Sequence, residues 1–182
     1  MLFTMSSAGL YQSISFHRPN NTNDIVLGAE DQKADAGLPV RLIIPLLNIN
    51  ASVQYLGITQ GEMDSPNNSS DVGWFMPGSR PGENGSTVIA GHLNEKDGSK
   101  GVFANLNKLK TGDILYIEDS NKNIFTYAVR ESRLYDHGYA EEVFIPNDSP
   151  HLNLITCEGV WNQNTNTYNK RLVVFTDLMY SR

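Results

Sequence analysis

The chain has 182 residues and a mass of 20.2 kDa, which suits one ordinary domain with a tail rather than two full domains. Its 40% hydrophobic and 19% charged residues predict a globular body and exclude a largely disordered chain. The net charge of −6 and the pI near 5.1 give no general basic field, so we expect no binding to nucleic acid.

The first 37 residues differ in composition from the rest. The chain contains no stretch of 18 or more apolar residues, which fits either a cytosolic protein or an extracellular domain whose anchor lies outside this sequence. Residues 17–37 are mostly polar, charged and turn-forming, which is typical of a linker. The sequence therefore predicts a flexible N-terminal arm and linker over 1–37 and a folded domain over 38–182.

From Pro39 onward, short β-favouring runs alternate with Gly, Pro, Asn and Asp, which is typical of an all-β domain. Pro45 lies inside the first run and indicates an edge position or a bulge, because proline cannot donate to a strand ladder. The sequence DSNK at 119–122 has the composition of a hairpin turn. The predicted strands are 40–47, 51–55, 87–90, 114–118, 124–132, 152–156 and 171–178.

Helical content is expected to be small. Phe103, Leu106 and Leu109 recur at intervals of three, which predicts one short helix or 3₁₀ turn. At least six short strands with one or two helical turns favour a closed or nearly closed barrel, since closure removes exposed strand edges.

Three residues whose side chains could take part in catalysis lie at the ends of predicted strands. They are His92, which follows a strand, Cys157, which ends one, and Arg171, which opens one. Each has a common structural alternative, as a satisfied histidine, a buried apolar thiol and a solvated edge charge. Together they match the needs of thiol catalysis. A thiolate attacks a carbonyl, an imidazolium stabilises that thiolate, and the forked donors of arginine hold the developing oxyanion.

The order of these residues and their flanking sequences resembles the sortases, the cysteine transpeptidases of Gram-positive cell surfaces. The likeness runs from about Pro39 to Met179. It includes IPLLNINASVQYLGI, VGWF, RPGENGSTVIAGH, LKTGD, LITCEG and RLVVFTDL, and the VGWF and RPGE stretches are most similar to the class F branch. The family's usual TLxTC reads NLITC here, so Asn153 stands where threonine is common.

The resemblance implies an all-β fold, an eight-stranded sortase-type β-barrel with one or two short helices, and a catalytic domain over 38–182. It also implies roles for the three residues: Cys157 as nucleophile, His92 as general acid and base, and Arg171 as substrate and oxyanion clamp. We expect Thr156, Val160 and Trp161 to bind substrate, the last two from a surface loop between Cys157 and Arg171. Trp161 has the alternative of pinning that loop to the barrel.

A sortase-like enzyme would bind an LPxTG-type sorting peptide and cleave it between Thr and Gly through a thioester. The expected partners are the sorting signal of a surface protein and an amine acceptor such as a peptidoglycan cross-bridge or a pilin lysine. The expected location is the extracellular face of the plasma membrane of a Gram-positive bacterium. Two alternatives remain open: a cysteine peptidase that acts by hydrolysis, and a non-catalytic β-barrel binding module.

No cofactor and no metal are expected. Cys157 is the only cysteine, so the repeated Cys/His ligand sets of structural zinc sites are absent. The remaining candidates are interpreted as exposed and structural or as solvated charges. They are His137 and His151, which lie beside turn residues, and Glu95, Asp97, Glu141 and Glu142, which lack EF-hand spacing for calcium.

Overall fold

The computed structural model of the chain describes residues 36–95, 97–138, 141–144, 148–165 and 167–180. These residues fall within the compact unit Lys33–Arg182. The predicted arm and linker, 1–37, lies outside the described residues except for Ala36 and Gly37.

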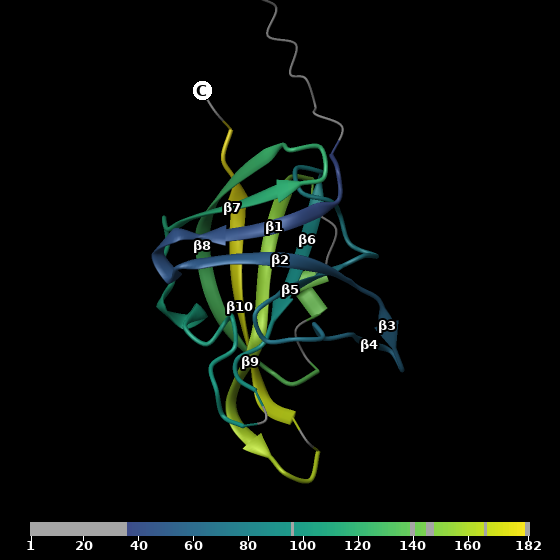
Figure 1. Ribbon diagram of the computed structural model, residues 1–182, viewed down its shortest axis with the longest axis vertical. Helices are drawn as coiled ribbons and strands as arrows, with labels where there is room; N and C mark the ends of the chain where they lie inside the picture. Colours follow the sequence, from purple (N-terminus) through teal and green to yellow (C-terminus); the bar gives the residue numbers. More distant parts are fainter. Residues whose placement is uncertain (1–35, 96, 139–140, 145–147, 166, 181–182) are drawn as a thin grey trace, which may run out of the picture. The chain divides into compact units, whose positions relative to one another are not determined.

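Eight strands form a closed barrel in the order β1-β2-β5-β6-β9-β10-β8-β7 (Figure 1). This confirms the predicted eight-stranded β-barrel. The barrel strands are β1 (Pro39–Ile44), β2 (Ile49–Leu56), β5 (Val72–Phe75), β6 (Gly85–Gly91), β7 (Ile114–Asp119), β8 (Ile124–Asp136), β9 (Pro150–Asn162) and β10 (Thr167–Leu178). Outside it are the small hairpin β3 (Ile58–Thr59) and β4 (Glu62–Met63) and the 3₁₀ turns η1 (Pro45–Leu47), η2 (Leu106–Lys108) and η3 (Glu141–Phe144).

The core fills the barrel with side chains that alternate along the strands. In β7 every second residue is buried, the pattern of a strand with one face on a core. Branched aliphatic side chains dominate the interior, and Tyr127 is fully buried with its hydroxyl accepting a hydrogen bond from Gly82 N. This burial raises the pKa of Tyr127 to about 12. Phe103, Leu106 and Leu109 belong to the same cluster, so the predicted 3₁₀ turn at η2 closes part of the barrel.

Two predicted details differ in the structure. The first run does not continue through Pro45, because the strand ends at Ile44 and Pro45 occupies the start of η1, where its missing N–H is not needed. The segment between Cys157 and Arg171 is not a loop, because β9 and β10 continue as paired strands to Asn162 and Thr167. The resulting hairpin projects from one end of the barrel (Figure 1).

The predicted turn at 119–122 joins β7 to β8 and is organised by Asp119. Its carboxylate accepts hydrogen bonds from the backbone N–H groups of Asn121 and Asn123 and from Gly37 N, at 2.8–2.9 Å. Burial raises the pKa of Asp119, but the hydrogen bonds from Asn123, Gly37 and Asn121 outweigh it, so the pKa lies below its usual range.

Two of the neighbouring strand pairs are parallel, and this decides where chemical groups gather. β6 and β9 run in the same direction, as do β2 and β5. Parallel neighbours end at the same edge and require long connections. The carboxyl end of β6 lies beside the middle of β9, near Ile155, and β9 continues past it into the hairpin. β10, antiparallel to β9, passes the same point early in its course.

Candidate active site

Cys157 and Arg171 lie directly opposite each other on β9 and β10. Opposed residues of antiparallel strands point to the same face of a sheet, with Cβ atoms about 4.5–5.5 Å apart. Burial raises the pKa of the Cys157 thiol above its ordinary value, and the positive charge of Arg171 acts against that rise. The side chains are therefore electrostatically coupled.

His92 reaches the same place from β6. The parallel register aligns Ala90 with Ile155, so His92 and Cys157 each lie two residues further along neighbouring strands. Between these points the Thr156 hydroxyl donates a 2.8 Å hydrogen bond to the Gly91 carbonyl. This bond joins the end of β6 to β9 one residue before the histidine and the cysteine.

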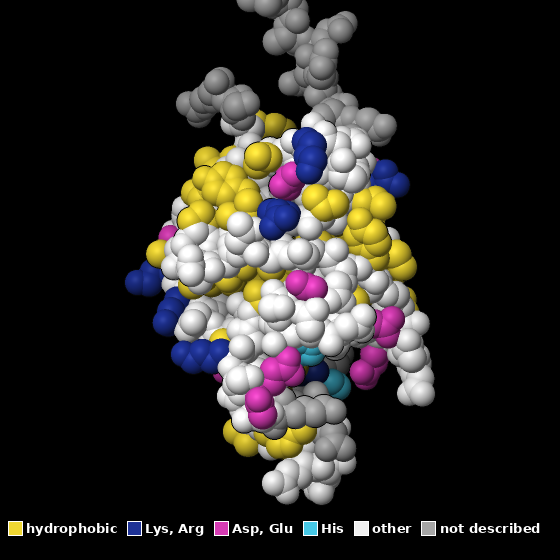
Figure 2. Space-filling model, viewed as in Figure 1, with side chains coloured by type: hydrophobic (Ala, Val, Ile, Leu, Met, Phe, Trp, Pro, Cys, Tyr) yellow, Lys and Arg dark blue, Asp and Glu magenta, His cyan; other side chains and the backbone are white. Residues whose placement is uncertain are grey.

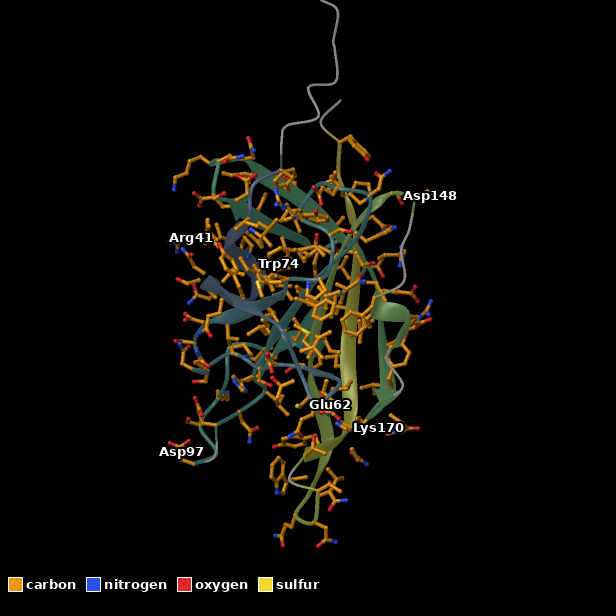
Figure 3. The ribbon with its side chains drawn as sticks, turned by 90° about the vertical axis from the view of Figure 1, so that its right-hand side faces the viewer. Arg41, Glu62, Trp74, Asp97, Asp148 and Lys170 are labelled. Carbon is orange, nitrogen blue, oxygen red and sulfur yellow. The ribbon has the colours of Figure 1, made fainter. Side chains whose placement is uncertain are left out.

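The three residues line one cleft at the end of the barrel from which the β9–β10 hairpin projects. Figure 2 shows histidine side chains recessed at this end, with acidic side chains on either side. Glu62 and Lys170, both labelled in Figure 3, also lie toward this end. The cleft thus holds a thiol, an imidazole and a guanidinium that come from strands far apart in the sequence.

Arg171 is held by its own strand. Its Nη1 donates to the carbonyl oxygens of Tyr168 at 3.0 Å and Lys170 at 2.9 Å, and its Nη2 donates to Thr167 Oγ1 at 3.1 Å. A register shift between Tyr168 and Lys170 bulges the strand at this point. Within the described residues, Nε–H and the second hydrogen of Nη2 have no partner, so two donors of the fork remain available.

The other residues expected to bind substrate have different surroundings. Thr156 borders the cleft, but its side chain is buried and its hydroxyl is engaged by the Gly91 carbonyl. Trp161 lines the cleft and packs edge-to-face on Tyr168, with ring centroids 5.2 Å apart. Val160 is 70% exposed and is not among the residues that line the cleft.

Several cleft residues were missed by the sequence interpretation. His137, expected to be exposed and structural, lines the cleft. So do Phe144, from η3, and the segment Glu62–Pro66, from the β3–β4 hairpin and the loop after it. The pattern ITQGEM, with Gln60 and Gly61 both at positive φ in its turn, is the one local signal of that hairpin.

His151 lies outside the cleft in a separate polar group. Its Nε2 is 3.0 Å from Ser149 Oγ, and its Nδ1 is 2.8 Å from Asp177 Oδ1. Arg130 Nη1 donates to the same carboxylate oxygen at 2.7 Å. The Asp177 carboxylate is thus already paired with a guanidinium, which agrees with a structural role for His151.

The described residues contain no group of three or more His, Cys, Asp or Glu side chains arranged to hold a metal ion. No helix formed by them is long and apolar enough to cross a membrane.

A sequence model of the sortase domain matches residues 42–179, more than half of the chain. The chain belongs to the sortase family. This confirms the resemblance, and with it the assignment to the cysteine transpeptidases of the sortase type. A search of curated protein sequences gives no match.

Solved sortase structures share the fold of this sortase. Sortase C-1 from Actinomyces oris is 23% identical, with a TM-score of 0.62 over 78% of this chain and 73% of that one. Sortase A from Listeria monocytogenes is 22% identical, with a TM-score of 0.60 over 80% and 89% of the two chains. A sortase D5 transpeptidase from Clostridium perfringens is 23% identical, with a TM-score of 0.60 over 79% of each chain. The more specific likeness to class F stays a prediction.

Proposed function

We propose that this sortase cleaves an LPxTG-type sorting peptide between Thr and Gly and transfers the new acyl group to an amine acceptor. The observation that carries the proposal is the opposed pair Cys157 and Arg171, with His92 at the adjoining strand end in the same cleft. A nucleophile, a proton carrier and a fixed cation in one cleft are the groups that acyl transfer through a thioester requires.

In the first half-reaction, the thiolate of Cys157 attacks the carbonyl carbon of the peptide threonine. The carbonyl oxygen becomes an oxyanion, and the two unused donors of Arg171 are suited to hold it. As the tetrahedral intermediate collapses, the C–N bond breaks and protonated His92 gives its proton to the departing glycine amine. Cys157 is then left as a thioester.

In the second half-reaction, an incoming amine attacks the thioester and loses a proton to His92. The C–S bond breaks, the thiolate returns and the product is a new amide. Water attacking in place of the amine would give a carboxylic acid, so hydrolysis is the competing outcome of the same chemistry.

The walls of the cleft support both substrates. Met63, Phe144 and Ile155 border it with apolar surface that suits the leucine and proline of a sorting peptide. Glu62 and Glu95 border it with carboxylates that favour the approach of an ammonium group. The proposed partners are accordingly a sorting signal and a peptidoglycan cross-bridge amine or pilin lysine, at the extracellular face of a Gram-positive plasma membrane.

The raised pKa of Cys157 bears on how the enzyme is charged. Because burial favours the neutral thiol, only a minor fraction of the enzyme carries the thiolate at neutral pH. The raised pKa predicts that the rate of Cys157 alkylation keeps rising with pH beyond the range in which a free thiol has already ionised.

A competition assay tests the function. The enzyme is incubated with a sorting peptide and increasing concentrations of a glycine amide, and the acid and amide products are separated by mass. Transpeptidation predicts that the amide product replaces the acid as the amine concentration rises, and that Cys157→Ala forms neither product. A product ratio independent of amine would support the peptidase instead, and turnover by Cys157→Ala would contradict both enzyme functions.

A further inference from the structure

The imidazole of His92 is held by a backbone carbonyl from a distant part of the chain. Its Nε2 lies 2.8 Å from the carbonyl oxygen of Pro66, a buried residue of the loop between β4 and β5. A carbonyl oxygen only accepts, so Nε2 carries the hydrogen in this contact. In a neutral imidazole the other nitrogen, Nδ1, is then the unprotonated one.

The loop that presents this carbonyl is fixed by Gln54 of β2. Its side-chain oxygen accepts a 2.9 Å hydrogen bond from the backbone N–H of Asn67, the residue next to Pro66. Its side-chain nitrogen donates to Asp71 Oδ2 at 3.0 Å. One side chain thus ties the middle of the loop to its end.

Asn68 braces the same loop from within. Its Oδ1 accepts from the backbone N–H groups of Ser70 at 3.0 Å and Asp71 at 2.8 Å, and its Nδ2 donates to Asp71 Oδ2 at 2.8 Å. The hydrogen bonds from Asn68 and from Gln54 hold the pKa of Asp71 below its usual range. The carboxylate therefore keeps its charge, and its role as acceptor, at working pH.

The loop also supports the backbone that follows His92. Val102 N donates to the Ser69 carbonyl at 2.7 Å, and Phe103 N donates to the His92 carbonyl at 2.9 Å. The histidine is thus held at its ring by Pro66 and at its backbone by a segment bound to the same loop.

We propose that Gln54 and Asn68 are positioning residues for His92, and that the Pro66 carbonyl confines proton transfer in the sortase reaction to Nδ1. Nε2 keeps its hydrogen throughout. In the imidazolium, Nδ1–H gives its proton to the departing glycine amine; in the neutral imidazole, Nδ1 takes a proton from the attacking amine. The bond to Pro66 strengthens when the ring is charged, because charge-assisted hydrogen bonds are the stronger ones.

This inference rests on the proposed function for its chemistry, but the ring hydrogen is observable without substrate. Nitrogen-15 NMR of the full chain with labelled histidine distinguishes the two ring nitrogens. In the wild type at a pH where His92 is neutral, we expect a protonated Nε2 and an unprotonated Nδ1. A resting enzyme with the hydrogen on Nδ1 would overturn the proposal.

Gln54→Ala supplies the second readout. Without the brace, the Nε2 and Nδ1 signals should move toward each other as the tautomers mix. Of the two hydrogen bonds that this change removes, only the one from Asn67 N holds the residue next to Pro66. The rate of peptide transfer should therefore fall about threefold to tenfold, the range expected for one hydrogen bond, and the acid limb of its pH profile should shift. Asn68→Ala, on the exposed side of the loop, should change the ring-nitrogen signals, the transfer rate and the pH profile in the same direction as Gln54→Ala.

Asn123→Ala is the matched control. It removes a 2.9 Å hydrogen bond from an asparagine to a carboxylate, Asp119, in the turn between β7 and β8. It should lower stability without altering the His92 signals or the pH profile. Equal changes of the His92 signals and of the pH profile in Gln54→Ala and Asn123→Ala would refute the positioning role. A chain that shows the predicted tautomer but forms no amide with a sorting peptide would contradict the proposed function and not the placement of the hydrogen.

Discussion

Replacing Thr156 by valine should cost both stability and activity. The change keeps the shape of the side chain but removes the hydroxyl that donates a 2.8 Å hydrogen bond to the Gly91 carbonyl. Thr156 is 3% exposed and Gly91 is buried, so the carbonyl that loses its donor has little access to solvent. A buried acceptor left without a partner costs about 1–3 kcal/mol of unfolding free energy. For a domain of this size, each kcal/mol lowers Tm by about 2–4 °C.

The activity loss has a separate origin. Gly91 precedes His92, and the Thr156 hydroxyl joins the end of β6 to β9 just before the histidine and Cys157. Freeing the end of β6 allows the imidazole to drift from the thiol. Because small displacements of reacting groups reduce rates strongly, kcat/KM should fall about tenfold to a hundredfold.

The chain supplies a matched control in Thr176. Its hydroxyl donates a 2.7 Å hydrogen bond to the Leu152 carbonyl, and the residue is fully buried on β10, away from the cleft. Thr176→Val should therefore lose a similar unfolding free energy in urea titrations, yet retain kcat/KM within about twofold. If both variants lost the same activity, Thr156 would act through general stability alone, and the reasoning about the strand ends would be wrong.

Three further predictions concern charge and backbone space. Arg171→Ala should raise the pKa of Cys157 further, since burial remains and the opposing charge is lost, whereas Arg171→Lys, which keeps the charge, should not. Superimposable pH profiles of iodoacetamide alkylation for the wild type and Arg171→Ala would contradict this. Gly101→Ala should cut peptide transfer about tenfold, because an added Cβ would overlap the His92 carbonyl, and an unchanged transfer rate would show that this backbone has room to move. Asp119→Asn should lessen the loss of stability in acid. The pKa of this carboxyl is lower in the folded than in the unfolded chain, so its stabilisation is present above about pH 4 and is lost as pH falls through the folded pKa. If urea titrations showed that wild type and variant lose the same unfolding free energy between about pH 5 and about pH 2.5, the prediction would be refuted.

Most barrel strands could be predicted from local composition, because alternating branched residues bounded by turn formers determine both a strand and its buried face. β5 was not among the predicted strands. Its sequence VGWF is only four residues long, with three of them buried, so it has no alternation to detect. Its place is set by neighbours, since it pairs with β2 on one side and β6 on the other.

The extent of β9 and β10 could not be predicted for a related reason. The sequence from Gly159 to Asn169 is rich in asparagine and also contains glycine and threonine, which favours a loop. The structure pairs it, with Gly159 at φ 88° and the Asn169 side chain accepting from Val160 N at 2.8 Å. Polar side chains close to the backbone thus stabilise a bulged hairpin that composition alone does not reveal.

In the site, the candidate catalytic side chains could be identified from the sequence, but the groups that surround them could not. A lone cysteine, a histidine after Ala-Gly and an arginine opening a strand stand out by kind. The Pro66 carbonyl at His92 does not, because a backbone acceptor leaves no trace in residue identity. The contact depends on strand pairing, because the antiparallel register of β5 and β6 sets Val72 opposite Gly91 and brings the loop before β5 beside His92.

Trapping the acyl-enzyme tests the central claim most directly. The full chain is incubated with LPxTG-type peptides without an added amine, quenched in acid and digested, and the peptide containing Cys157 is weighed by mass spectrometry. We predict a mass increase equal to the peptide acyl group ending in threonine, located on the sulfur, and absent from His92→Ala and Arg171→Ala under the same conditions. An unmodified Cys157 in enzyme that turns the peptide over, or an acyl group on any other side chain, would contradict it.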